Sequence, residues 1–205
     1  PFLASISYHT GTIALLSPYT IDGVKNPETD EAWPISQAMI QTLPKVVQNR
    51  RFKVKRKLYS VDGVDQDWHR FEHGTLALLL EAARFAPKRL DERQALIKSL
   101  RPSWRFLANR FLSGPAISIR VLDSDGHPLN TKVSIDRMQP PNGEVWKSRC
   151  PGGIYRRYLP KPGNYTLRIQ GPGERVKKWI TVTHELKEIE IRLSKAWPKA
   201  RCTPL

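Results

Sequence analysis

The stretch T-L-A-L-L-L-E-A-A, residues 75–83, is an apolar run that holds a single carboxylate, Glu81. A short continuous run of this kind is typical of a strand buried on both faces, as in a parallel sheet, although periodicity alone does not exclude a helix. A carboxylate in apolar surroundings is suited to act as a general base near neutral pH, whereas a Glu at a strand end is often just the first solvated residue. The run predicts a buried strand and makes Glu81 a candidate for chemistry.

Two strands, a loop and a helix are expected before this run. Residues 2–8 and 12–16 are apolar and β-prone, and residues 18–31 are rich in the Pro, Gly, Asn and Asp typical of a loop. Residues 33–48 have helical periodicity, and Pro44 should bend or shorten that helix.

Three further segments surround the apolar run. The segment R-R-F-K-V-K-R-K, residues 50–57, alternates apolar and basic side chains, which indicates a strand with one solvated face and, as the alternative, a phosphate-binding segment. Residues 60–74 are polar and aromatic and are expected to form a loop. Residues 91–113 have helical periodicity, with a kink expected near Pro102 and an end at Gly114-Pro115.

The composition changes after Gly114. Alternating runs separated by turn sequences such as D-S-D-G, P-P-N-G and P-K-P-G predict a small antiparallel β-sandwich over residues 116–194. Six strands are expected: A-I-S-I-R-V-L, T-K-V-S-I-D, G-I-Y-R-R-Y, N-Y-T-L-R-I, K-W-I-T-V-T and E-I-E-I-R-L. The 205 residues would therefore form two parts, followed by a tail, K-A-W-P-K-A-R-C-T-P-L.

The charge is strongly basic, with 34 Lys and Arg against 19 Asp and Glu and a formal net charge of +15. Such a field attracts polyanions. Only Lys25 and Lys45 are basic among the first 47 residues, so the excess lies downstream. We do not expect nucleic acid as the partner, because no stacking aromatics are interleaved with the basic segment and no nucleic-acid-binding motif is present.

The chain is not expected to span a membrane, since no run of eighteen apolar residues occurs. The opening P-F-L-A-S-I-S lacks the charged start and the cleavage site of a secretory signal. A first residue within a strand-like sequence suggests that residue 1 is a cut into a longer chain.

Three residues of the first part attract attention together: His9 after a strand, Tyr59 before a Gly-containing loop, and Glu81. A neutral imidazole is the commonest zinc ligand among side chains, and a buried carboxylate can serve as a base. Taken one at a time, a His is more often structural, a loop Tyr usually packs, and a Glu is often solvated.

The order and spacing of these three residues resemble the C-terminal half of the catalytic domain of zinc metallocarboxypeptidases, of the carboxypeptidase A/B and D/E/N type. In that family the third zinc-binding His is followed nine residues later by Pro and an aromatic, and here Pro18-Tyr19 stands at that offset from His9. The D/E/N branch has a Y-x-V-x-G-G-M-Q-D loop, and residues 59–67 read Y-S-V-D-G-V-D-Q-D. In the family the catalytic glutamate lies thirteen positions after the residue that follows the Asp of this loop. Here that residue is Trp68, and the position thirteen residues later is Glu81.

A second resemblance concerns residues 119–135, I-R-V-L-D-S-D-G-H-P-L-N-T-K-V-S-I, which look like the opening of the transthyretin-like sandwich that follows the D/E/N catalytic domain. The two resemblances imply an α/β part at residues 1–113, belonging to a mixed-sheet carboxypeptidase domain, and an all-β transthyretin-like domain at residues 114–205. They also imply a secreted or periplasmic protein. In that setting Cys150 and Cys202 are expected to pair, with two free thiols as the alternative.

The resemblance implies hydrolysis of the C-terminal bond of a peptide or protein with Zn²⁺ as cofactor. Zinc would activate a water and polarise the scissile carbonyl, and Glu81 would take the proton and pass it to the leaving amine. His9 would be one zinc ligand. Tyr59 would bind the peptide from a mobile loop, and Gln66 would lie in the pocket that reads the C-terminal side chain.

The sequence departs from the family pattern in two places. The H-x-x-E motif that should supply two more zinc ligands upstream of His9 is absent, as are the substrate-binding arginines, so an N-terminal half from the same precursor or from a second chain is expected to complete the site. The H-R-F-E-H segment, residues 69–73, lies downstream, and we interpret it as loop. Thr20 stands where enzymes favouring C-terminal Lys or Arg carry an acid, which Asp22, Asp62 or Asp65 could replace; a bacterial cell-wall peptide is a further possible target.

A non-catalytic relative that binds partners through its sandwich is the alternative function. It predicts that no upstream H-x-x-E is encoded. Without further ligands, residues 1–205 alone are expected to be inactive under either hypothesis.

Overall fold

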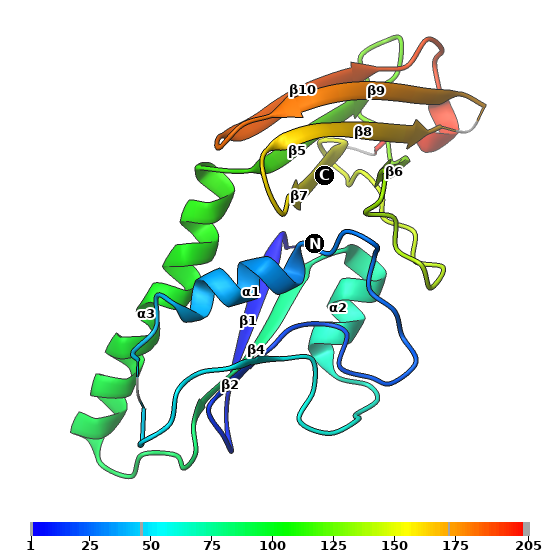
Figure 1. Cartoon of the computed structure of the whole chain (residues 1–205). Helices are drawn as coiled ribbons and strands as arrows, with labels where there is room; N and C mark the ends of the chain where they lie inside the picture. Colours follow the sequence, from blue (N-terminus) through cyan, green and yellow to red (C-terminus); the bar gives the residue numbers. More distant parts are fainter. Residues whose placement is uncertain (1, 46, 172, 203–205) are drawn as a thin grey trace.

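The computed structural model describes residues 2–45, 47–171 and 173–202 (Figure 1). Pro1 of the expected first strand and residues 203–205 of the expected tail lie outside the described residues. The described residues form three α-helices, ten β-strands and one short 3-10 helix, arranged with three β-sheets. The chain therefore has mixed α and β structure.

The first part is built on a four-stranded sheet with the strand order β1-β4-β2-β3. Its strands are β1 (Ala4–Thr10), β2 (Ala14–Leu16), β3 (Val54–Lys55) and β4 (Leu76–Ala83). The apolar run at residues 75–83 forms β4, which is buried on both faces except for a partly exposed Leu79. It pairs parallel with β1 and antiparallel with β2, so the predicted buried strand is confirmed.

Three helices accompany this sheet: α1 (Ala32–Ile40), α2 (Asp65–His73) and α3 (Leu90–Leu112). α1 is shorter than the predicted 33–48, because Pro44 can neither donate to the helix nor let the residue before it stay helical. The expected loop over 60–74 is wrong in its second half, where α2 forms. The negative charges of Asp65 and Asp67 stabilise the helix because they lie in its first turn, at the positive end of the helix dipole. Gly74, at φ 67°, ends the helix at its C-terminus.

The third helix is continuous through Pro102 and ends one residue before the predicted Ser113. Its buried side chains and those of α1 pack on the β4 residues Leu76, Leu78 and Leu80 in one hydrophobic cluster. Because side chains alternate along a strand, Leu79 and Glu81 point to the opposite face of the sheet. α2 packs on β4 and is linked to β1 by a hydrogen bond of 2.7 Å from Ser7 Oγ to Asp65 Oδ2.

The basic segment 50–57 contributes the short strand β3 and follows the interpretation of a strand with one solvated face. Phe52 is buried, whereas Lys53 and Lys55 are exposed. Arg56 lies 4.7 Å above the Trp33 ring and pairs with Asp30, so this guanidinium is already engaged within the chain.

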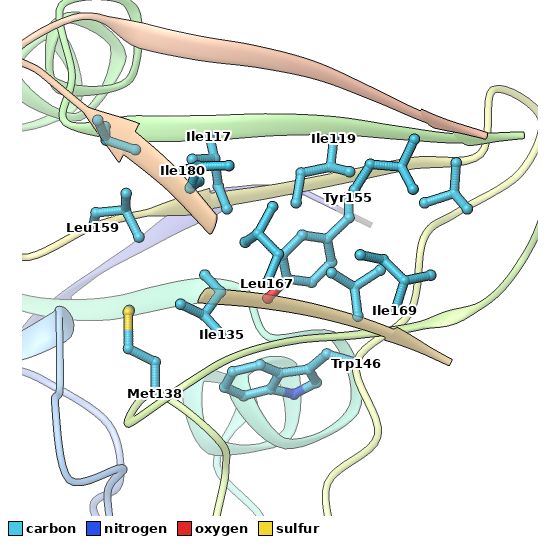
Figure 2. Close-up of a cluster of buried hydrophobic side chains, with 14 of the residues drawn as sticks. Ile117, Ile119, Ile135, Met138, Trp146, Tyr155, Leu159, Leu167, Ile169 and Ile180 are labelled. Atoms are coloured by element: carbon cyan, nitrogen blue, oxygen red, sulfur yellow. The ribbon is translucent and has the colours of Figure 1, made fainter. Parts of the chain in front are cut away.

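All six strands expected after Gly114 are present: β5 (Ala116–Leu122), β6 (Lys132–Ile135), β7 (Ile154–Tyr158), β8 (Gly163–Gln170), β9 (Arg175–Val182) and β10 (Leu186–Arg192). They form two three-stranded sheets, β10-β5-β7 and β6-β8-β9. Figure 2 shows that Ile117 and Ile119 of one sheet face Ile135, Leu167 and Ile169 of the other across a shared core. We call residues 116–202 the two-sheet region.

The prediction that this region is purely antiparallel is wrong at one pair, because β10 runs parallel to β5. The chain crosses from one sheet to the other between β9 and β10, so β9 and β10 do not form a hairpin within one sheet. β10 therefore arrives beside β5 in the same direction.

Cys150 and Cys202 form a disulfide, as expected from the resemblance. It joins the tail to the segment before β7. The tail is also held by Asp123, a buried carboxylate at the end of β5 whose Oδ2 accepts hydrogen bonds from Trp197 N and Arg201 Nε.

Replacing both cysteines by Ser is expected to lower the free energy of unfolding by about 2–4 kcal/mol, because the disulfide limits the freedom of the unfolded chain. The residues it joins are 52 positions apart, so a long loop would be released. Urea unfolding of the double variant measures the change, and reduction of the wild type should give the same midpoint. An unchanged midpoint in both experiments would contradict the prediction.

The first part and the two-sheet region meet at a buried ion cluster formed by Glu31, Arg70 and Arg157. Glu31 Oε1 accepts hydrogen bonds from Arg70 Nη1 at 2.7 Å and Arg157 Nε at 3.1 Å, and Glu31 Oε2 accepts one from Arg157 Nη2 at 3.1 Å. The Trp146 ring lies 4.9 Å from the Arg70 guanidinium and 4.1 Å from that of Arg157. We call these four residues the junction cluster.

No helix in the described ranges is both long enough and apolar enough to cross a membrane.

Candidate functional site

His9 and Glu81 lie directly opposite each other on neighbouring parallel strands. His9 is the penultimate residue of β1, and its register partner on β4 is Glu81. The two side chains share the face of the sheet on which α2 packs, and His9 Nδ1 is 3.3 Å from Glu81 Oε1. The structure thus brings together two residues that are 72 positions apart in the sequence.

The two partners differ sharply in exposure. The imidazole of His9 is 68% exposed, whereas the carboxylate side chain of Glu81 is only 8% exposed. Glu81 is therefore not the first solvated residue after a strand. Its Oε2 is buried and has no hydrogen-bond partner among the described residues. A buried carboxylate oxygen without a partner is costly, so this atom is poised to interact with a group from outside the described chain.

Gly11 leaves room beside this carboxylate. A Cβ atom at this position would lie 3.5 Å from Glu81 Oε2, and the residue adopts φ 152° at the irregularity where the β1–β4 register shifts. The chain then turns back into β2, whose Ala14 pairs with Glu81 from the other side. Glu81 is therefore fixed between two strands, with its carboxylate at the end of β1.

Asp67 fixes the loop that follows β2. Its carboxylate accepts hydrogen bonds from the backbone N–H groups of Thr20 and Ile21 and from Thr20 Oγ1, at 2.8–3.0 Å. The Pro18–Tyr19 peptide bond in this loop is cis. The loop is thereby tied to the first turn of α2.

The other side of this loop is held by the two-sheet region. Tyr19 donates a hydrogen bond of 2.6 Å to Glu144 Oε1, and Asn142 also donates to that carboxylate. Burial favours neutral Glu144, but these hydrogen bonds outweigh it and hold its pKa below the usual range. Burial and the bond to Glu144 raise the pKa of Tyr19, so the phenol stays protonated.

The remaining predicted site residues, Tyr59 and Gln66, are not in contact with the His9–Glu81 pair by any hydrogen bond among the described residues. Tyr59 is 71% exposed and lies in the irregular segment before α2. Gln66 is buried in the first turn of α2, and its Oε1 has no partner in the described part of the chain. One predicted residue is thus exposed to solvent, and the other is buried.

The acids proposed to replace Thr20 are mostly engaged. Thr20 itself is buried against Asp67. Asp22 pairs with Lys57, and Asp65 accepts from Ser7. Asp62 is exposed and has no ion-pair partner within the described ranges. Of the three, Asp62 and Asp65 make no ion pair within the described ranges, and both are exposed.

The H-R-F-E-H segment is helical, which corrects the expectation of a loop. His69 and His73 pack around Trp68, with ring centroids 4.9 Å and 5.0 Å from the indole. Burial and the nearby Arg149 guanidinium lower the pKa of His73, and its Nδ1 lies 3.1 Å from Arg149 Nη2. Arg70 of the same segment belongs to the junction cluster. These contacts account for the segment without a metal.

One group of three potential metal ligands occurs among the described residues: Asp123, Asp125 and His127. These side chains already have partners within the chain. Asp123 Oδ1 accepts hydrogen bonds from the N–H groups of Asp125 and His127, and Arg201 forms ion pairs with both Asp123 and Asp125. Burial raises the pKa of Asp123, but the His127 backbone and Arg201 outweigh it and keep the pKa well below its usual value. The group closes a turn and anchors the tail.

The described residues around His9 do not include two further His, Cys, Asp or Glu ligands that converge with it. A zinc site needs three or four such ligands. The pair therefore offers one exposed imidazole and one buried carboxylate, and the described residues around it do not make up a zinc site.

The junction cluster and the roles of Asp67 and Glu144 were not predicted from the sequence. Glu31 and Arg70 looked like ordinary charged loop residues, and nothing local marks them as buried. One signal was available for Asp67. It matches the family's loop motif, and because the binding role in that motif was assigned to Gln66, a structural role for Asp67 could have been predicted.

No protein-family model matches the chain, and no curated protein matches it.

Proposed function

We propose that the protein is part of a zinc-dependent metallocarboxypeptidase that hydrolyses the C-terminal peptide bond of a peptide or protein. The observation that carries the proposal is the convergence of His9 Nδ1 and Glu81 Oε1 at 3.3 Å, with Glu81 buried and its other oxygen unpartnered. The motif spacing alone would allow these groups to point to opposite faces of the sheet.

Glu81 would accept a proton from the attacking water and return it to the leaving amine. A base for this purpose must be within hydrogen-bond reach of the water it activates. β4 holds the carboxylate between β1 and β2, so it cannot swing away. Tyr59, exposed on an irregular segment, would close on the bound peptide, and Gln66 would contribute to the pocket for the C-terminal side chain.

His9 would be one of the ligands that hold zinc. Bound zinc would supply a Lewis acid that activates water and polarises the scissile carbonyl. Because His9 is a single ligand, tight binding requires further ligands from additional polypeptide, which we propose comes from an N-terminal half of the same precursor or from a second chain.

The outer edge of β1 is suited to receive that polypeptide. β1 is a terminal strand of the sheet and pairs only with β4 among the described strands, so its other edge presents backbone N–H and C=O groups that a further strand can pair with. Beside it lie two apolar hollows, of about 500 Å³ and 530 Å³, between β1 and α3. Trp104 and Tyr8, both about half exposed, line them. An added strand would bury this surface and end near His9.

The finer fold assignment is part of the same proposal. We infer that residues 1–113 are the C-terminal half of a carboxypeptidase domain and residues 114–205 a transthyretin-like sandwich. The disulfide Cys150–Cys202 supports an oxidising location, hence a secreted or periplasmic protein.

His9→Ala is expected to lower zinc affinity of the native protein, isolated with the chain that completes it, by at least about a hundredfold, because a direct ligand is lost. Zinc content after dialysis measures this. The matched control is His184→Ala, which removes an exposed imidazole from the turn before β10. Full zinc content in the His9 variant would refute the ligand role.

The alternative is a carboxypeptidase-like scaffold without catalysis. Its support is that the loop after β2 is stabilised within the chain, by the buried contacts of Thr20 with Asp67 and of Tyr19 with Glu144, and needs no substrate for this. A native protein that carries no zinc and releases no C-terminal residue would favour it.

A further inference from the structure

The outer face of the β6-β8-β9 sheet differs from the rest of the two-sheet region in its side chains. Along β8, Leu167 and Ile169 enter the core, so Arg168 and Gln170 point outward. Register then places Lys177 beside Arg168 and Arg175 beside Gln170 on β9, and it places Lys132 beside Gln170 on β6. We call this face the cationic face.

Its cations are largely unneutralised. Within the described ranges, no carboxylate lies within 4.0 Å of the Lys132, Arg175 or Lys177 side chain. Arg168 is the exception, because it makes a two-pronged contact with Asp136. Three cations on one small sheet therefore repel one another unless an anion is bound.

These cations border a hollow of about 360 Å³, which the loop after β6 completes. Arg168 and the three unneutralised cations all line it, together with the amides of Gln139 and Gln170. Glu144 also lines it, but its carboxylate already accepts from Tyr19 and Asn142. The hollow is thus a concave site with positive charge and amide groups, of which the Gln139 amide donates to Asp136.

Trp179 extends the site along β9. It is 73% exposed, and Lys177 Nζ lies 5.0 Å from the ring centroid. Its cross-strand neighbour is Thr166, and the next pair, Asn164 and Thr181, is also polar. A flat exposed ring among hydroxyl and amide groups offers a stacking surface for a sugar ring, whose hydroxyls the neighbours would bind.

We propose that the cationic face binds an anionic polysaccharide, with Lys132, Arg175 and Lys177 contacting its acidic groups and Trp179 stacking on a sugar ring. Charge complementarity requires a polyanion. Single-stranded nucleic acid would need successive aromatic rings, and in the described part of this face Trp179 is the one exposed ring. The disulfide also favours a compartment in which anionic polysaccharides are the common polyanions. This inference is independent of the peptidase proposal.

The test is binding of the purified protein to dextran sulfate, with neutral dextran of the same length as the matched polymer. Arg175→Gln together with Lys177→Gln is expected to weaken binding about tenfold or more, and the loss should shrink as salt is raised. Lys187→Gln together with Lys195→Gln is the control, because it removes the same charge from exposed positions elsewhere in the two-sheet region.

Trp179→Ala separates a sugar site from a purely ionic surface. It should weaken binding to dextran sulfate about fivefold while leaving elution from a cation exchanger unchanged. Equal losses in the two double variants would overturn the proposal, because binding would then follow net charge alone. Tighter binding to oligo(dT) than to dextran sulfate would also overturn it, in favour of a nucleic-acid surface.

Discussion

Glu81→Gln is expected, under the proposed peptidase function, to reduce the release of C-terminal residues by about 10²–10⁴-fold, the range that a positioned general base contributes. The amide has the same shape as the carboxylate but cannot take a proton from water. Because β4 is buried and Gln can still contact His9, we expect the fold and the zinc content to be unchanged. Hydrolysis of an N-terminally blocked peptide and zinc analysis of the same sample measure both properties.

Glu72→Gln provides the matched control for this prediction. Glu72 is an exposed glutamate in the last turn of α2, and its carboxylate makes no ion pair with a described residue. Its variant should keep full turnover. Retained turnover in Glu81→Gln would refute the role of Glu81, and loss of zinc from that variant would show that the carboxylate acts as a ligand.

Glu31→Gln is expected to lower the free energy of unfolding by about 3–5 kcal/mol, since removing one partner of a buried ion cluster leaves the other charges uncompensated. Both guanidiniums that contact Glu31 are buried: the side chains of Arg70 and Arg157 are 0% and 3% exposed. A domain has only about 5–15 kcal/mol of stability in total. Urea unfolding of the purified protein would reveal the loss as a lower midpoint.

Glu28→Gln is the control for the junction cluster. Glu28 pairs with Arg137 at 2.9 Å, but both side chains are mostly exposed, so the change should stay within about 0.5 kcal/mol. Equal effects of the two variants would contradict the structural importance of Glu31.

The stability that Glu31 provides should depend on pH in a defined window. Burial favours the neutral acid, but Arg157 and Arg70 outweigh burial and lower the pKa of Glu31 from 4.5 to about 2. A lowered pKa means that the contribution is fully present above about pH 4.5 and is lost as the pH falls toward 2. The difference between wild type and Glu31→Gln should therefore shrink across this range.

The sequence predicted strands better than helices and local features better than long-range ones. The six strands of the two-sheet region follow from alternation and turn residues, which act within a few positions. The parallel β5–β10 pair did not follow, because it depends on which sheet the chain enters after β9. α2 was missed because its residues are mostly polar or charged and its stability comes from packing on β4, from Asp67 and from the glycine that ends it.

The candidate site shows the same division. The spacing of His9, Pro18-Tyr19 and Glu81 indicated residues that share a site, and two of them are in contact in the structure. The partners that fix this region, Asp67 and Glu144, come from segments 47 and 125 positions away from the residues they hold. No local pattern encodes such distances, so they required the coordinates.

The junction cluster restricts how the two parts of the chain can be recombined. A two-sheet region grafted from another protein would have to bring a guanidinium at the place of Arg157 and a flat ring at the place of Trp146. Without them Glu31 would keep Arg70 as its hydrogen-bond donor at Oε1, while its buried Oε2 would lose the bond from Arg157. Swaps near residue 114 should therefore succeed only between chains that share this set of residues.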